Sequence, residues 1–162
     1  MSAPTGNTRA VRAAAAVVVA ALAIAAIAEA KGSTLFTGTF SGDTGAVSFK
    51  LKKSHGKRSV ALWTWDDLPV VCNGESRETS GYFLRDRKPL PVERRKFAGR
   101  AVLRDGEKIV GKAKVTGEFE KGYESASGLF RVTGRIPEDP KTTDCNSGLR
   151  GWTATEGIRP AR

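Results

Sequence analysis

The sequence predicts an all-β protein with about eight or nine strands, arranged as an antiparallel β-sandwich of jelly-roll type or as a meandering barrel. Apolar and polar side chains alternate with a period of two through most of the segment from Leu35 to Ala154, which is typical of antiparallel strands that cover a core on one side. Turn-forming pairs such as Asn73-Gly74 separate the alternating segments at regular intervals. No window beyond residue 30 has the periodicity of a helix.

Residues 1–30 have the layout of a secretory signal peptide. Two arginines precede an apolar, alanine-rich run at 13–27, and the segment 28–30 has the small-x-small pattern of a cleavage site. A retained membrane anchor is the alternative, but the run is shorter than the roughly 20 strongly apolar residues of a comfortable span. We therefore expect an exported protein, secreted or held in the cell envelope, in which 31–162 forms a single β-domain without a membrane span.

Several alternating segments show which side chains face the core. In each segment, apolar residues and glycines occupy one set of alternate positions, while lysines, arginines and other polar residues occupy much of the other set. An antiparallel sheet with one buried face produces this pattern. The expected inward positions are Val47, Phe49, Leu51, Phe97, Gly99, Ala101, Leu103, Ile109, Gly111, Ala113, Val115, Gly117, Phe119, Phe130, Val132 and Gly134.

Glycine and proline positions predict the connections. Asp105-Gly106 lies between two alternating segments and predicts a tight hairpin, because both residues tolerate a positive φ. Pro89 and Pro91 make 85–96 a loop or an irregular edge.

The element Gly-x-Phe recurs along the chain. Within a strand its glycine and phenylalanine share a face, so a ring can lie over the space left by its own glycine or by a neighbour's. The copies are Gly38-Thr39-Phe40, Gly117-Glu118-Phe119 and Gly128-Leu129-Phe130.

The two cysteines, Cys72 and Cys145, are expected to form a disulfide, because an exported chain with an even number of cysteines normally pairs them. In the chain-entropy model a bridge across about 73 residues stabilises the fold by roughly 4 kcal/mol. The alternative is a pair of reactive thiols, but the chain has no Cys-x-x-Cys motif and neither cysteine has a neighbouring histidine.

The residue counts exclude several classes of functional site. A single histidine, His55, leaves no multi-histidine metal site, and two cysteines cannot form a four-thiolate zinc centre or an iron–sulfur cluster. His55 lies among lysines and arginines in a predicted surface turn, and the chain has no Gly-x-Ser-x-Gly motif and no phosphate-binding loop. We therefore expect a non-enzymatic protein with no catalytic residues, no metal and no cofactor.

Trp63 and Trp65 share one face of an expected strand, where they either fill the core or form an exposed platform for sugar rings. Asp66 and Asp67 follow them and are expected in a solvated turn, with a calcium site as the alternative. Together with Glu75 these residues define the alternative function, which is a carbohydrate-binding or carbohydrate-hydrolysing jelly-roll domain.

The chain is strongly basic, with 27 Lys and Arg against 17 Asp and Glu and a formal net charge of +10. A basic surface concentrates anions and accelerates their association, so an exported protein of this charge is expected to contact anionic cell-envelope polymers. No motif for specific nucleic-acid recognition is present. The alternatives are that the charge serves solubility and protects edge strands, or that 85–96 is the exposed loop of an inhibitor or adhesion module. The residues expected to contact a polyanion are Lys50, Lys52, Lys53, Lys57, Arg58, Arg94, Arg95 and Lys96.

A set of short motifs is spread over most of 31–162. Phe36-x-Gly38-x-Phe40 comes early, a Gly-x-Phe-x-Val strand comes later, and Cys145-Asn-Ser-Gly is followed by Trp152-Thr-Ala. In these motifs the chain resembles small secreted all-β proteins of unknown function from high-GC Gram-positive, actinobacterial species. The resemblance implies the location and the fold, and it implies no activity.

Overall fold

The computed structural model describes five stretches of the chain, which form ten β-strands and no helix. The predicted signal peptide at 1–30 lies outside the described residues. The described stretches are 32–42, 45–83, 88–105, 107–135 and 143–157. The strands are β1 (Ser33–Phe40), β2 (Ala46–Ser54), β3 (Lys57–Cys72), β4 (Glu75–Phe83), β5 (Leu90–Val92), β6 (Lys96–Asp105), β7 (Lys108–Phe119), β8 (Ser125–Gly134), β9 (Cys145–Asn146) and β10 (Arg150–Glu156).

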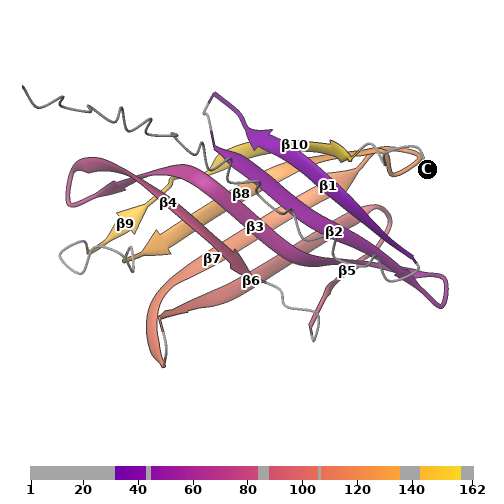
Figure 1. The fold of residues 1–162 in the computed structure, drawn as a ribbon, viewed down its shortest axis with the longest axis horizontal. Helices are drawn as coiled ribbons and strands as arrows, with labels where there is room; N and C mark the ends of the chain where they lie inside the picture. Colours follow the sequence, from indigo (N-terminus) through magenta and orange to yellow (C-terminus); the bar gives the residue numbers. More distant parts are fainter. Residues whose placement is uncertain (1–31, 43–44, 84–87, 106, 136–142, 158–162) are drawn as a thin grey trace, which may run out of the picture.

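Six strands form a closed ring in the order β10–β1–β2–β3–β9–β8, because β10 pairs with both β1 and β8 (Figure 1). Beyond β8 the sheet continues through β7 to β6, while β4 and β5 pair with the other edge of β3. All of these pairings are antiparallel. The predicted all-β class is therefore confirmed.

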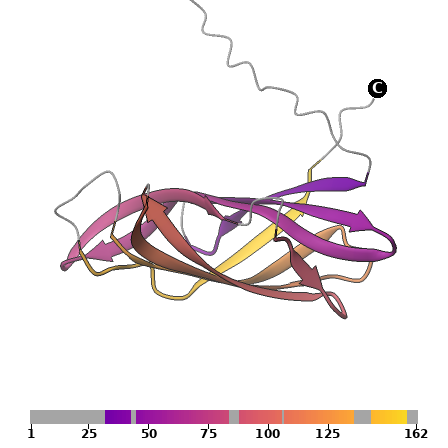
Figure 2. The ribbon, with the colours of Figure 1, turned by 90° about the horizontal axis from the view of Figure 1, so that it is seen from below.

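The barrel is flattened into two layers (Figure 2). Strands β1 to β4 lie in one layer and β6 to β8 lie in the other, while β10 runs from one layer to the other. The molecule is thus closed on the side of β1 and β10, and β4, β5 and β6 lie on its opposite side.

Aromatic rings from both layers meet in a single core. Trp63 of β3 has its ring centroid 5.2 Å from that of Phe49 and 4.9 Å from that of Trp152. Trp63 is fully buried and Trp65 is only 4% exposed, so both fill the core and neither forms a surface platform. The remaining phenylalanines of this core are Phe36, Phe40, Phe83, Phe97, Phe119 and Phe130.

Glycines on the inner face make room for these rings. At Gly117 of β7, an added Cβ atom would lie 2.5 Å from Phe97 Cζ and 2.6 Å from Trp152 Cζ2. At Gly81 of β4, an added Cβ would lie 2.5 Å from Trp65 Cζ2. Of the three predicted Gly-x-Phe copies, only Gly117 therefore lies against rings, and these rings belong to other strands. An added Cβ at Gly38 or Gly128 would instead meet the backbone of a neighbouring strand.

One part of the predicted inward pattern is wrong. Ile109, expected in the core, is 62% exposed, whereas its neighbour Val110 is only 8% exposed. The reason is a register shift in the β6–β7 hairpin, where Leu103 lies opposite Gly111 but Arg104 lies opposite Ile109. Val110 is the extra residue on β7, and such a bulge exchanges the faces of the residues beyond it.

The predicted hairpin is present with its turn one residue further along the chain than Asp105-Gly106, and the predicted irregular edge is present as well. In the hairpin between β6 and β7, Asp105 lies opposite Lys108. The irregular edge contains the short strand β5, which pairs with β3. Leu90 of β5 packs over Gly99 of β6, where an added Cβ would lie 2.5 Å from Leu90 Cδ1. In this way β5 covers one part of the open side between the layers.

A disulfide between Cys72 and Cys145 connects the end of β3 to β9, as the cysteine count predicts. Strand β9 has only two residues, and its Asn146 pairs with both β3 and β8. Next to the bridge, Thr143 Oγ1 donates a hydrogen bond to Asn73 Oδ1 at 3.0 Å. Disulfides persist in oxidising compartments, so this bond indicates an extracytoplasmic protein.

We expect Gly117→Ala to lower the free energy of unfolding by about 1–3 kcal/mol, because the added methyl group would overpack the core against Phe97 and Trp152. Urea unfolding followed by tryptophan fluorescence measures this. The control is Ser127→Ala, at an exposed position of β8, which should change the free energy by less than about 0.5 kcal/mol. Equal stability of Gly117→Ala and the parent would contradict the packing described above.

Replacement of both cysteines, Cys72→Ala/Cys145→Ala, should lower the free energy of unfolding by up to about 4 kcal/mol, because the bridge spans a sequence separation of 73 residues. Urea midpoints of the variant and the parent, measured without reductant, give the difference. A thiol reagent added to the unfolded parent is the companion measurement. Reaction of both cysteines in the absence of reductant would show that the bridge is missing.

Candidate functional site

The predicted polyanion-contact residues flank the β2–β3 turn and the β5–β6 turn, which lie at the same end of the molecule (Figure 1). Arg58, which follows the first turn, lies opposite Val92 of β5, and its guanidinium carbon is 3.9 Å from the centre of the Tyr123 ring. The first turn is flanked by Lys50, Lys52, Lys53, Lys57 and Arg58, and the second by Arg94, Arg95 and Lys96.

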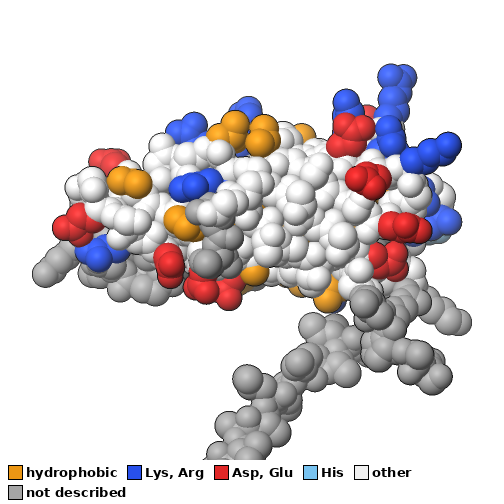
Figure 3. All heavy atoms as spheres, turned by 90° about the horizontal axis from the view of Figure 1, so that it is seen from above, with side chains coloured by type: hydrophobic (Ala, Val, Ile, Leu, Met, Phe, Trp, Pro, Cys, Tyr) orange, Lys and Arg blue, Asp and Glu red, His pale blue; other side chains and the backbone are white. Residues whose placement is uncertain are grey.

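Carboxylates neutralise part of the charge at this end. Glu118 Oε1 lies 3.4 Å from Arg95 Nη2, and its Oε2 lies 3.6 Å from Lys96 Nζ. The space-filling view shows lysines and arginines interspersed with aspartates and glutamates at the right-hand end of the molecule (Figure 3). The two predicted basic runs therefore contribute to a surface of mixed charge.

A second group of cations, which the sequence pattern assigns only to the polar faces of strands, has no carboxylate partner in the part of the chain that the structure describes. Within this group, Arg131 Nε donates a hydrogen bond to Asn146 Oδ1 at 3.2 Å. Arg100 of β6 lies opposite Lys114 of β7, and Lys114 lies opposite Arg131 of β8. Lys112 occupies the same face of β7, two positions before Lys114. All four side chains are exposed, and none forms an ion pair with a carboxylate of the described residues. We call Arg100, Lys112, Lys114 and Arg131 the cationic row.

Burial of the residues on the inner face of these strands directs the side chains of the cationic row toward solvent. Ala113, Val115 and Phe130 are buried and alternate along β7 and β8 with the cations. Because successive side chains of a strand point to opposite faces, burial of these residues forces the cations into solvent. Adjacent strands are about 4.8 Å apart, and like charges directly opposite each other destabilise a sheet. The row therefore places like charges side by side on a solvated face, which is unfavourable by itself.

The outer face of β6, β7 and β8 is hollowed along its length. The hollow at the cationic row has a volume of about 590 Å³. A broader, open hollow of about 1230 Å³ extends to Arg94, Arg95 and Lys96. These three predicted contact residues therefore share a face with the cationic row, whereas the group at the β2–β3 turn belongs to the other layer.

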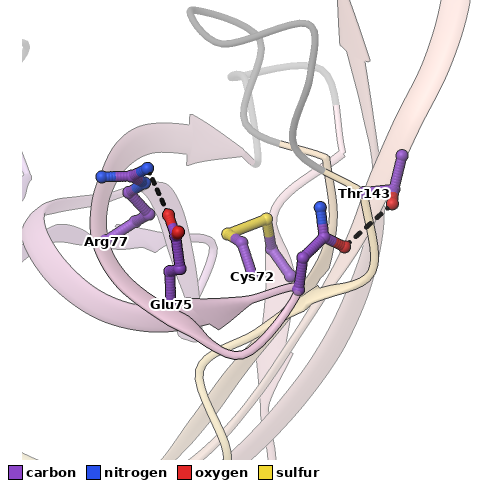
Figure 4. Close-up of a disulfide and its surroundings, with 6 residues drawn as sticks. Cys72, Glu75, Arg77 and Thr143 are labelled. Carbon is purple, nitrogen blue, oxygen red and sulfur yellow. Dashed lines mark hydrogen bonds and ion pairs between the residues drawn. A yellow bond between two sulfur atoms is a disulfide. The ribbon is translucent and has the colours of Figure 1, made fainter.

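The predicted acidic residues are not assembled into one site. Ser80 Oγ donates to Asp66 Oδ1 and accepts a hydrogen bond from the backbone N–H of Asp67 at 3.0 Å. Glu75 lies at the other end of the β3–β4 hairpin, near the disulfide, where its Oε2 is 2.6 Å from Arg77 Nη2 (Figure 4). Among the described residues, no three His, Cys, Asp or Glu side chains are grouped closely enough to hold a metal ion.

His55 occupies an exposed turn between β2 and β3, as the sequence predicts, and its backbone φ is 49°. Its Nδ1 atom lies 2.9 Å from Ser54 Oγ. The buried positions of Trp63 and Trp65 leave the alternative carbohydrate-binding function without the exposed indoles on which it depends.

Comparisons of the chain with protein-family models, with curated proteins and with solved structures gave no match. Within the described stretches, no helix has the length and apolar character needed to cross a membrane.

We expect Lys114→Gln to raise the free energy of unfolding by about 0.2–1 kcal/mol at low ionic strength, because it removes the central charge of the cationic row. The gain should shrink in 1 M salt, where the screening length is about 3 Å. Urea unfolding at the two salt concentrations measures both effects. The control is Lys88→Gln, which removes a charge that is also exposed but lies outside the row and should leave stability unchanged. A gain for Lys88→Gln equal to that for Lys114→Gln would show that net charge alone is responsible.

Proposed function

We propose that this protein is a secreted or envelope-associated, non-enzymatic β-domain that binds anionic cell-envelope polymers through the outer face of β6, β7 and β8. The observation that carries the proposal is the cationic row, in which Arg100, Lys114 and Arg131 lie directly opposite one another without a carboxylate partner among the described residues. The fold keeps these like charges adjacent, and an anionic ligand removes the repulsion between them.

The expected location outside the cytoplasm supports an anionic polymer as the partner. The chain begins with a predicted signal peptide at 1–30, and the domain contains the Cys72–Cys145 disulfide. Outside the cytoplasm the abundant polyanions are wall polymers and other envelope components. A protein with a formal net charge of +10 is attracted to such a surface over roughly a Debye length, which is about 10 Å at 0.1 M salt.

The shape of the face favours a polymer over a small anion. The cations are spread over three strands along one hollow. A second, open hollow is lined by Arg94, Arg95 and Lys96 together with Glu93 and Glu118. A small anion can contact only one or two of these side chains, whereas a flexible chain with repeated charges can follow the face. Each additional contact releases counterions, so affinity is expected to depend steeply on salt.

The proposal assigns no catalytic role to the domain. Asp66 and Asp67 are joined through Ser80, Glu75 is paired with Arg77 at the far end of the hairpin, and His55 lies in a separate turn. General acid–base catalysis requires such groups to converge within hydrogen-bond reach of one substrate atom.

Heparin is the probe for a test of the proposed function. We expect the parent protein to bind a heparin column at low salt and to elute as salt is raised, and Arg100→Gln/Lys114→Gln/Arg131→Gln to elute at clearly lower salt. In solution, the slope of log K against log salt should fall by about one for each cation removed. Titration of labelled heparin at several salt concentrations measures this slope.

The matched control is Lys53→Gln/Lys57→Gln/Lys88→Gln, which removes the same charge from exposed positions away from the row. This control should retain most of the binding, and thermal unfolding should show that both variants are folded. Equal losses in the two triple variants would mean that net charge drives the interaction, and the proposed face would be wrong.

A further inference from the structure

The edges of the two layers do not pair with each other along β4 and β6. Among the described strands, β4 pairs with β3 alone and β6 pairs with β7 alone (Figure 2). Between these edges the structure contains a cleft of about 650 Å³. Strand β5 covers the part of this side where Leu90 contacts Gly99, and the cleft lies beyond it, toward Leu103 and Arg104.

The walls of the cleft are formed by inward-facing side chains of both layers. Trp65 and Phe83 line it from β3 and β4, and Leu103, Val110 and Val132 line it from β6, β7 and β8. These side chains are continuous with the aromatic core, since Trp65 and Phe83 also contact each other at a centroid distance of 6.1 Å. The cleft therefore reaches the apolar space between the two layers, and Thr79 and Ser80 of β4 also line it.

Apolar and basic side chains surround the opening. Tyr82 of β4 and Val102 of β6 line it and are 52% and 50% exposed, although both are large hydrophobic residues. Arg104 and Arg135 also line it, and neither is paired with a carboxylate of the described residues. Arg104 Nη1 donates to the backbone oxygen of Glu107 at 2.9 Å, which holds this side chain beside the hairpin.

We propose that this cleft binds a single-chain fatty acid, with the hydrocarbon tail between the layers and the carboxylate at Arg104 and Arg135. The apolar walls gain about 25 cal/mol for each Å² of surface that the tail removes from water. Arginine binds carboxylates through paired, charge-assisted hydrogen bonds, which gives the anionic head its position. The volume of about 650 Å³ falls within the range of about 300–1,000 Å³ typical of small-molecule sites.

This site adjoins the proposed polymer-binding face, because Ala101 and Val102 line both hollows, but the two sites use different charged residues. Arg100 and Lys114 of the cationic row line only the hollow on the outer face, whereas Arg104 lines only the cleft. A fatty acid carries one charge and needs an apolar cavity, and a polyanion needs several cations and no cavity.

Isothermal titration of the full chain with laurate, below the concentration at which laurate forms micelles, tests the proposal. We expect saturable binding of one laurate per protein. Acetate has the same carboxylate without the tail, and dodecyltrimethylammonium has a tail of the same length with a positive head. Neither should bind, because each lacks one of the two features that the cleft recognises.

Two variants locate the site. Arg104→Gln/Arg135→Gln should weaken laurate binding at least about tenfold, because the charge-assisted hydrogen bonds to the carboxylate are lost. Ala101→Leu should weaken it by filling the cleft. The control, Arg100→Gln/Arg131→Gln, removes the same charge from the outer face and should bind laurate like the parent.

If Ala101→Leu does not fold, the double arginine variant decides the outcome. Arg104 is exposed and Arg135 is half-buried, and neither belongs to the aromatic core. Absence of laurate binding, undiminished binding in Arg104→Gln/Arg135→Gln, or an equal loss in the outer-face control would each overturn the proposal. The heparin measurements do not depend on these results, so failure of one proposal is distinguishable from failure of the other.

Discussion

The packing of Trp63 against rings from both layers is the interaction on which the rest of the structure depends. Phe49 stacks on one side of its indole, and Trp152 meets it edge to face from β10. This contact joins the strands at the closed side of the barrel to the centre of β3. Because side chains along a strand alternate between two faces, fixing the inner residues also fixes every outer one. The outward direction of the cationic row is a consequence of this core.

Closure of the six-strand ring depends on covalent and hydrogen bonds at β9 and not on the packing of the aromatic core. Strand β9 has only two residues, yet it is the connection between β3 and β8 at one end of the barrel. Two residues form too few ladder hydrogen bonds to hold a strand in place against its loss of conformational entropy. The Cys72–Cys145 bond and the hydrogen bond from Val132 N to Ser147 Oγ at 2.9 Å attach this segment on both sides. Covalent closure here replaces the long strand that a regular barrel would use.

The sequence predicts the class of fold, most of the core and the disulfide, because these follow from alternation and from cysteine count. The prediction of which residues face the core is wrong at Ile109 and Val110, because a bulge exchanges the buried and exposed positions without a signal in the local sequence pattern. It misses the cationic row for a related reason. A two-residue turn at Asp105-Gly106 would not place Arg100 opposite Lys114. In the observed pairing of β6 with β7 the turn is shifted along the chain, and the bulge at Val110 shifts the pairing once more. Because the register decides which residues of β6 and β7 lie opposite each other, the cationic row could not be predicted without it.

The cleft could not be predicted from any single segment, because it exists where two strands fail to pair. The same strand, β6, contributes to both proposed sites: Leu103 lines the cleft, Arg100 belongs to the cationic row, and Ala101 lines both hollows. An edge strand that exposes apolar side chains and unpaired backbone groups is prone to aggregation. Positive charge on its outer face opposes pairing with a second copy of the chain. The cations on β6 therefore oppose pairing at the open edge, and the proposed binding of anions would need the same residues in the same outward positions.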